Sequence, residues 1–307
     1  MGAGSCSLVV LRASRKSTLR WTVPHGGSKI QRISSIARND MDIPTTAIRV
    51  YGEPPFGVAV LHGGPGAPGY MAPVARELAQ VTGVLEPLQT MDSLEGQIRE
   101  LRTQLADHAD IPVTLIGSSW GAVLALLLAA REDKLVRKLI LVGSAVFDAQ
   151  NSSKVEARRM SRLDAGKRRR HETLKMELEM ATPADSRRLM REWGEIILEA
   201  DVYDPLTTDL EVLDLQYDLH KKVWSDFVAL RDHPTRLGSE FSRIDAPVLV
   251  LHGDFDPHPM EGIRPFLESC LRDVRFHTLS ECGHYPWIER RARNQFFDIL
   301  MQEILSP

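Results

Sequence analysis

The stretch Gly117-Ser118-Ser119-Trp120-Gly121 decides the fold of this chain. It follows Val113–Ile116, a short β-branched apolar run, and precedes Ala122–Ala130, an apolar run of strong helix formers. A strand, one Gly-x-Ser-x-Gly and a buried helix are the context that a nucleophile elbow requires. The serine of an elbow sits on a strained turn, where a side chain at either flanking glycine would collide with the neighbouring strand or helix. We therefore predict that Ser119 is a nucleophile and that the first amides of the helix lie beside its hydroxyl.

The competing interpretation of this stretch is a plain Gly/Ser turn before a core helix. Chance matches to Gly-x-Ser-x-Gly are common, but the flanking strand and helix favour the nucleophile. Ser118 precedes the position that both glycines frame, so we assign it to packing.

Size and composition fit one large α/β domain with an insertion. The chain has 307 residues, of which 43% are hydrophobic and 26% charged, enough to build a core with a charged surface. Its net charge of −3 gives no drive toward nucleic acid, and no apolar run reaches the ~18 residues of a membrane span, so we expect neither partner. Three widely spaced cysteines argue against a disulfide framework and favour a reducing, cytoplasmic location.

The first forty residues differ from the rest of the chain. They are rich in serine and basic residues, with Asp40 as the single acid. Such a composition resembles an organelle-targeting segment, which would place the protein in an organelle. The interpretation that we favour is that residues 1–41 form a disordered extension, or sequence upstream of a true start at Met41.

Short apolar runs alternate with helical periodicity from Ile48 onward, which predicts a mainly parallel sheet covered on both faces. Recurring leucine and isoleucine predict a helix over residues 94–105, and a similar stripe predicts a final helix over residues 296–304. The predicted strands are Ile48–Tyr51, Val58–Leu61, Val84–Leu85, Val113–Ile116, Leu139–Val142, Val248–Leu251 and Val274–Leu279.

The strand signal disappears between about Asp148 and Gly238, where the chain looks helical and highly charged. Thr182-Pro183-Ala184-Asp185 has the pattern of a helix start. We assign residues 148–238 to a helical cap over the carboxyl edge of the sheet, and residues 42–147 and 239–307 to the core. The basic run Lys167–Arg170 is followed at once by acids, so we interpret it as a solvated helix face.

A serine hydroxyl needs a base, and that base needs a carboxylate to fix its tautomer. His284 follows the last predicted strand, and Asp256 lies in the loop after the preceding one. Asp254 competes with Asp256, but it is closer to the strand end, where an aspartate commonly caps the turn through its own backbone. We therefore predict a triad in the chain order Ser119, Asp256, His284.

The glycine-rich loop His62-Gly63-Gly64-Pro65-Gly66 follows a predicted buried strand. It has neither the Lys-Ser/Thr ending of a P-loop nor a G-x-G-x-x-G spacing, so phosphate binding is not expected. Pro65 has no amide hydrogen, so we predict that the amides of Gly64 and Trp120 form an oxyanion hole. We expect His62 to hold this loop.

Two histidines and two aspartates after the Val248–Leu251 strand suggest a metal site at first sight. These residues are His252, Asp254, Asp256 and His258. Their spacing matches no zinc pattern, and the triad already explains the loop. We predict no metal and no cofactor.

Together these residues resemble the α/β-hydrolase superfamily, and most closely its proline iminopeptidase branch. His62–Gly66 matches the oxyanion motif of that branch, and Gly117–Gly121 is similar to its Gly-Gly-Ser-Trp-Gly elbow. Gly253-x-x-Asp256 and Gly283-His284 match its acid and base positions. The resemblance covers Ile48 to the C-terminus. It implies an α/β-hydrolase fold, with a mostly parallel central sheet, helices on both faces and a helical cap insertion.

The chain departs from that branch at two places. Branch members usually carry an Asp-Gln-Arg-Gly-type segment after the fourth strand, whereas the region here reads Glu86–Asp92 with a shorter connection. Ser118 also stands where the peptidases tend to have glycine. The loop that shapes the pocket in relatives must therefore differ.

The resemblance also implies a substrate-binding role for cap carboxylates, which bind the free α-ammonium of the substrate in that branch. Trp193 and Glu195, with Glu192 and Glu199 nearby, are the candidates here. The other interpretation is that these are ordinary glutamates of a helix surface.

Three functional hypotheses follow. The first is a serine hydrolase that acts through an acyl-enzyme as an aminopeptidase on a short peptide, often one with N-terminal proline. The second keeps this chemistry in a carboxylesterase that cleaves a small ester or amide. The third is a non-catalytic ligand-binding protein on a hydrolase scaffold, since a fold does not fix a function. The sequence predicts no oligomeric state.

Overall fold

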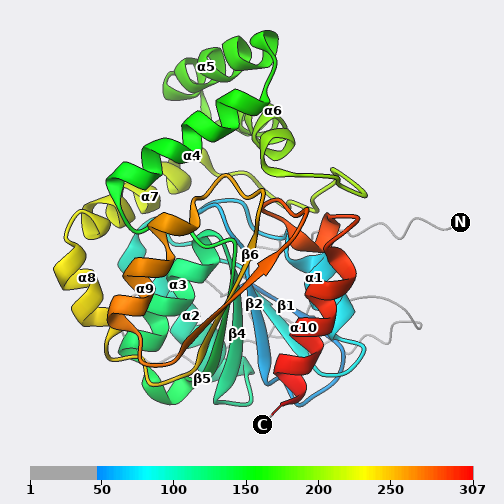
Figure 1. The fold of residues 1–307 in the computed structure, drawn as a ribbon, viewed down its shortest axis with the longest axis vertical. Helices are drawn as coiled ribbons and strands as arrows, with labels where there is room; N and C mark the ends of the chain where they lie inside the picture. Colours follow the sequence, from blue (N-terminus) through cyan, green and yellow to red (C-terminus); the bar gives the residue numbers. More distant parts are fainter. Residues whose placement is uncertain (1–46, 307) are drawn as a thin grey trace, which may run out of the picture.

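The computed structural model describes residues 47–306, so the expectations for residues 1–41 lie outside the described residues. A seven-stranded sheet in the order β1-β3-β2-β4-β5-β6-β7 forms the centre of the molecule (Figure 1). β1 is antiparallel to β3, and the other neighbouring strands are parallel. The strands are β1 (Ile48–Tyr51), β2 (Val58–Leu61), β3 (Val84–Pro87), β4 (Val113–Ser118), β5 (Val136–Val142), β6 (Val248–Gly253) and β7 (Val274–Leu279). The prediction of a mainly parallel sheet is confirmed.

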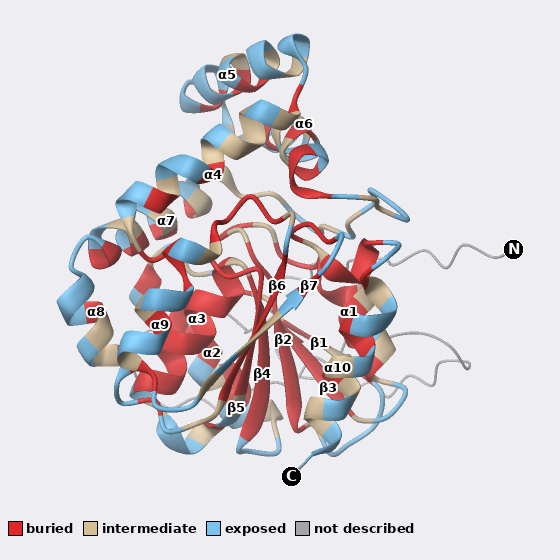
Figure 2. Cartoon of the chain, viewed as in Figure 1, coloured by how far each residue is buried: buried red, intermediate tan, exposed pale blue. Residues whose placement is uncertain are grey.

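Helices cover both faces of this sheet. Alternate residues of β2 show the two layers, because Ala59 and Leu61 pack with α2, α3 and α9, whereas Val58 and Val60 pack with α1 and α10. These core helices are α1 (Ala72–Leu78), α2 (Leu94–His108), α3 (Trp120–Arg131), α9 (Arg264–Cys270) and α10 (Arg293–Leu305). Short 3₁₀ turns lie at Asp133–Leu135, Met260–Gly262 and Pro286–Ile288. Figure 2 shows β2, β4 and α3 as the buried centre, whereas the edge strand β7 is partly exposed.

Five helices lie between β5 and β6, in the segment expected to form the cap. They are α4 (Ala149–Arg162), α5 (Ala165–Glu179), α6 (Pro183–Asp201), α7 (Tyr217–Arg231) and α8 (Pro234–Phe241). α5 and α6 rise above the sheet and share a small apolar cluster of their own. The apolar residues of α7 and α8, such as Phe227 and Phe241, belong to the main core. The inserted segment therefore includes helices that cover the sheet as well as helices that rise above it.

Two local predictions about the cap are confirmed. The Thr182 hydroxyl accepts the Asp185 amide hydrogen at 3.3 Å, so α6 begins where the sequence indicates. The basic run on α5 is ion-paired, with Lys167 bound to Glu199 and Arg170 to Glu192. Among residues 47–306, no helix combines the length and the apolar character needed to cross a bilayer.

Candidate active site

The turn between β4 and α3 is a strained elbow. Ser119 has φ 52° and ψ −112°, and its amide donates to the Val142 carbonyl at 2.9 Å. A Cβ at Gly117 would lie 2.3 Å from the Gly121 carbonyl oxygen, and a Cβ at Gly121 would lie 2.4 Å from the Leu61 carbonyl oxygen. The backbone thus requires glycine on both sides of the serine, as the sequence predicts.

The imidazole of His284 is paired with Asp256. Its Nδ1 lies 2.7 Å from Asp256 Oδ2, and both residues are buried. The other carboxylate oxygen, Oδ1, accepts the backbone amide and the Nδ1 hydrogen of His258, each at 2.8 Å. Although burial acts in the opposite direction, the histidine charges and these hydrogen bonds hold the pKa of Asp256 well below its usual range. Asp256 is therefore an ionised acceptor that serves two histidines.

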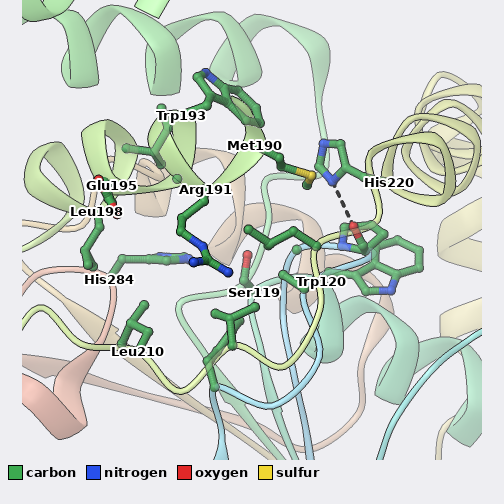
Figure 3. Close-up of a pocket in the computed structure, with 18 of the residues that line it drawn as sticks. Ser119, Trp120, Met190, Arg191, Trp193, Glu195, Leu198, Leu210, His220 and His284 are labelled. Atoms are coloured by element: carbon green, nitrogen blue, oxygen red, sulfur yellow. Dashed lines mark hydrogen bonds between the residues drawn. The ribbon is translucent and has the colours of Figure 1, made fainter. Parts of the chain in front are cut away.

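Ionised Asp256 fixes the tautomer of His284. With the hydrogen on Nδ1, the Nε2 atom is left as the basic nitrogen. Figure 3 shows the imidazole directed toward Ser119, and both residues line the same cavity. Within residues 47–306, no hydrogen bond joins the Ser119 hydroxyl to His284. Such contacts are commonly long without substrate and shorten in the complex.

The glycine-rich loop after β2 lies against the elbow. A Cβ at Gly63 would come within 2.8 Å of Ser119 Cβ, so only glycine allows this approach. Gly64 and Trp120 line the cavity together with Ser119. Trp120 is the first residue of α3, where a backbone amide has no partner within the helix. The two residues whose amides are predicted to form the oxyanion hole thus line the same cavity as Ser119.

Two histidines hold this loop. His62 Nδ1 donates to the Gly63 carbonyl at 3.0 Å, while its Nε2 accepts the Gln89 amide hydrogen at 3.3 Å. Burial lowers the pKa of His62 to about 4, so it stays neutral, as this pattern requires. From α7, His220 Nδ1 donates to the Pro65 carbonyl at 2.9 Å, which is the dashed line in Figure 3. The structural role predicted for His62 is confirmed.

The loop that carries His284 is hydrogen-bonded to the cap. The His284 amide donates to the Asp201 carbonyl at 2.7 Å, and Asp201, at the end of α6, is held by two 2.7 Å hydrogen bonds from Arg159 of α4. The fully buried Glu289 carboxylate accepts the amide hydrogens of Gly283, Tyr203 and Asp204. The position of the imidazole therefore depends on cap residues.

A cavity of about 800 Å³ lies between the cap and the elbow. Trp193 and Glu195, the predicted substrate-binding residues, both line it. The other two candidate glutamates are ion-paired elsewhere, Glu192 with Arg170 and Glu199 with Lys167. Glu195 is the one predicted cap carboxylate that stays available to a substrate.

Two residues of the site are not predicted from the sequence. Gly143, directly after β5, has φ 53°, and a Cβ there would lie 2.8 Å from His284 Nδ1 and 3.0 Å from Asp256 Oδ2. The sequence suggests His258 only as a metal ligand, whereas in the structure it binds Asp256 and stacks on His284 with ring centroids 4.5 Å apart. The sequence features that could have indicated them are a glycine directly after a buried strand and a histidine two residues after Asp256.

Asp254 has a structural role with a different partner from the one expected. Its Oδ1 accepts the Cys282 amide hydrogen at 3.2 Å, so it ties its loop to the loop of His284 instead of capping its own turn. The ligand atoms of Asp256, His258 and His284 lie within 4.8 Å of one another. The ligands of a metal ion lie this close together. Here, however, the Nδ1 atoms of His258 and His284 are both hydrogen-bonded to the Asp256 carboxylate.

Replacing Gly143 with alanine is expected to lower kcat about a hundredfold or more, because a methyl group would displace the imidazole and the carboxylate by a fraction of an ångström to an ångström. The positive φ adds a stability cost of about 1–3 kcal/mol. Steady-state kinetics and thermal unfolding separate the two effects. Gly238→Ala on α8, where a Cβ meets only ordinary contacts, is the control. An active Gly143→Ala enzyme would contradict this geometry.

Comparison with known proteins identifies the family. Residues 90–290 match the alpha/beta hydrolase fold family, and the chain belongs to it. Solved structures agree on the fold. An esterase (EaEST) from Exiguobacterium antarcticum is 20% identical, with a TM-score of 0.57 over 85% of this chain and 97% of that one. A proline iminopeptidase from Mycobacterium smegmatis is 18% identical, with a TM-score of 0.54 over 84% and 94%.

A putative lipase from Acinetobacter baumannii is 18% identical to this chain, with a TM-score of 0.55 over 84% of this chain and 87% of that one. No curated protein sequence gives a significant match. At these identities the likeness establishes the fold, and the chemistry has to be argued from the site.

Proposed function

We propose that this protein is a serine hydrolase that works by acyl transfer. Ser119 attacks a carbonyl carbon while His284 Nε2 takes its proton and Asp256 stabilises the imidazolium. The amides of Gly64 and Trp120 hold the tetrahedral oxyanion. His284 then protonates the leaving group, and water repeats the sequence on the acyl-enzyme. The observation that carries the proposal is the His284–Asp256 pair in one cavity with a serine on a strained elbow.

Within this chemistry we favour an aminopeptidase that releases an N-terminal residue, with Glu195 accepting the substrate ammonium. Support comes from the place of Glu195 and Trp193 in the cavity lining. The second candidate is a carboxylesterase, and the ion pairs that occupy Glu192 and Glu199 favour it.

A substrate panel separates the two candidates. Free and N-acetylated prolyl and alanyl arylamides are compared with 4-nitrophenyl esters of short acids. If only the free amino-acyl substrates turn over, and Glu195→Gln abolishes this turnover, the aminopeptidase is supported. Glu192→Gln is the matched control, because its carboxylate is bound to Arg170. Turnover of simple esters alone would support the carboxylesterase.

We expect kcat/KM to rise with pH as His284 loses its proton, with a midpoint above that of a free imidazole. Burial alone would lower the pKa of His284, but the Asp256 charge and hydrogen bond outweigh it and raise this pKa above its ordinary value. A base with a raised pKa is protonated, and inactive, over more of the acidic range. Burial lowers the pKa of His258 to about 4, so it does not titrate in this window. A pH profile with a neutral ester tests the expectation; a profile that falls from pH 6 to 8 would contradict it.

A further inference from the structure

The cap helix α6 directs a row of charged side chains into the cavity. Arg187, Arg191 and Glu195 follow one another at four-residue spacing and all line it. This spacing places successive side chains about 6 Å apart on one helix face. The row is therefore a surface that a substrate meets beside the nucleophile.

The two arginines of this row differ from the other basic residues of the cavity. Arg159 is bound to Asp201 at 2.7 Å, and Lys175 lies 3.5 Å from Glu156. Across the described part of the chain, neither Arg187 nor Arg191 has a carboxylate or carbonyl partner. Their guanidinium groups are the unpaired cations of the lining.

Of Arg191 and Glu195, it is Arg191 whose side chain points toward Ser119. Figure 3 shows its side chain extending from α6 toward Ser119, whereas Glu195 lies to the side, beside Leu198. Among the other acidic lining residues, Glu211 is paired with Arg76 and Glu156 with Lys175, whereas Asp209 and Asp214 have no ion pair in the described part of the chain. The side chain that α6 directs toward the serine is nevertheless the positively charged Arg191.

We propose that the substrate carries a carboxylate that Arg191 binds, with Arg187 extending the same site along α6. This inference rests on the proposed hydrolase function. A guanidinium fork matches a carboxylate in a bidentate arrangement, and it holds its charge at every pH at which the enzyme works. The carboxylate belongs either to the acyl part, as in a monoester of a dicarboxylic acid, or to the leaving group, as in a short peptide with a free C-terminus.

The test uses matched ester pairs that differ in one charge. For the acyl side, 4-nitrophenyl hemiglutarate is compared with 4-nitrophenyl valerate. For the leaving-group side, 4-acetoxybenzoate is compared with its methyl ester. We expect kcat/KM for the anionic member of one pair to exceed that of its neutral partner about tenfold to hundredfold, the range of a charge-assisted hydrogen bond. The pair that shows the preference identifies the part that carries the carboxylate.

Variants then assign the preference to its residue. Arg191→Gln is expected to collapse the anionic-to-neutral ratio toward one, and Arg191→Lys to restore part of it. Arg188→Gln is the matched control, because Arg188 lies on the same helix but does not line the cavity. In the Ser119→Ala protein, calorimetry with glutarate gives a readout without turnover, and Arg191→Gln should weaken this binding by a similar factor.

Three results would overturn the inference. One is the absence of a preference for the anionic member in both pairs. Another is an Arg191→Gln enzyme whose rates on both members fall equally, since Arg191 would then act on the oxyanion. The last is equal binding of glutarate by the Ser119→Ala protein and by its Arg191→Gln variant in calorimetry. Loss of the proposed function is distinct, because Ser119→Ala would then leave ester hydrolysis intact.

Discussion

Replacing Ser119 with alanine is expected to lower kcat about a millionfold, to the level left by binding and the oxyanion hole. The elbow holds this hydroxyl in the cavity that it shares with His284. Without the oxygen no acyl-enzyme forms, and activating water in place of the serine restores little of the rate. Steady-state kinetics on the best ester or arylamide of the panel measures the loss. A fluorophosphonate probe should label the wild type and leave Ser119→Ala unlabelled.

Ser118→Ala is the matched control for this variant. Ser118 is buried next to the nucleophile, and its hydroxyl accepts a long hydrogen bond of 3.4 Å from Tyr70. We expect a loss of less than about tenfold, since a weak neutral hydrogen bond contributes about 1 kcal/mol. If Ser119→Ala kept full turnover while remaining folded, the acyl-transfer mechanism would be wrong, and a ligand-binding protein on this scaffold would become the better hypothesis.

Replacing Asp256 with asparagine is expected to lower kcat about ten-thousandfold near neutral pH. Its Oδ2 receives the Nδ1 hydrogen of His284, and its Oδ1 receives two hydrogen bonds from His258. An amide offers one acceptor and one donor, so at one of the two histidines an N–H would face another N–H. Where the amide nitrogen faces His284, the imidazole would turn or change tautomer and present the wrong nitrogen to Ser119. The apparent pKa of its base should also fall, because the negative charge that raises it is lost.

Asp254→Asn separates the two aspartates of this loop. Its amide oxygen still accepts the Cys282 amide hydrogen, so we expect less than a tenfold loss. Kinetics and pH profiles of both variants decide between the two acids. A larger loss for Asp254→Asn than for Asp256→Asn would reverse the assignment.

The sequence predicted the sheet because parallel strands are buried on both faces and read as apolar runs. Every predicted strand is present, from Ile48–Tyr51 to Val274–Leu279. The elbow, the glycine-rich loop and the Asp256–His284 pair were predictable because each follows a strand, and the carboxyl ends of parallel strands meet at one edge. The order of the strands and loops along the chain was therefore enough to predict that these distant residues lie at one edge of the sheet.

The contacts that depend on side-chain packing were not predictable. A glycine after a buried strand does not indicate by itself that Gly143 touches His284 and Asp256. Likewise, His258 pairs with Asp256 only because the loop turns back on itself after Pro257. The charge that the cap directs toward Ser119 was also missed, since ion pairs between helices decide which cap residues stay unpaired. The resemblance suggested glutamates there, whereas Arg191 points toward Ser119.

The hydrogen bond from the His284 amide to Asp201 makes the inserted helices part of the proposed reaction centre. An engineered version shortened by excising residues 149–216 would lose Asp201, its partner Arg159, and two of the amides that Glu289 binds. The loop that carries His284 would then lose the contacts that set its position relative to Ser119, even if the sheet folded normally. A shorter version of this enzyme therefore has to be made by trimming its termini, with the middle of the chain left intact.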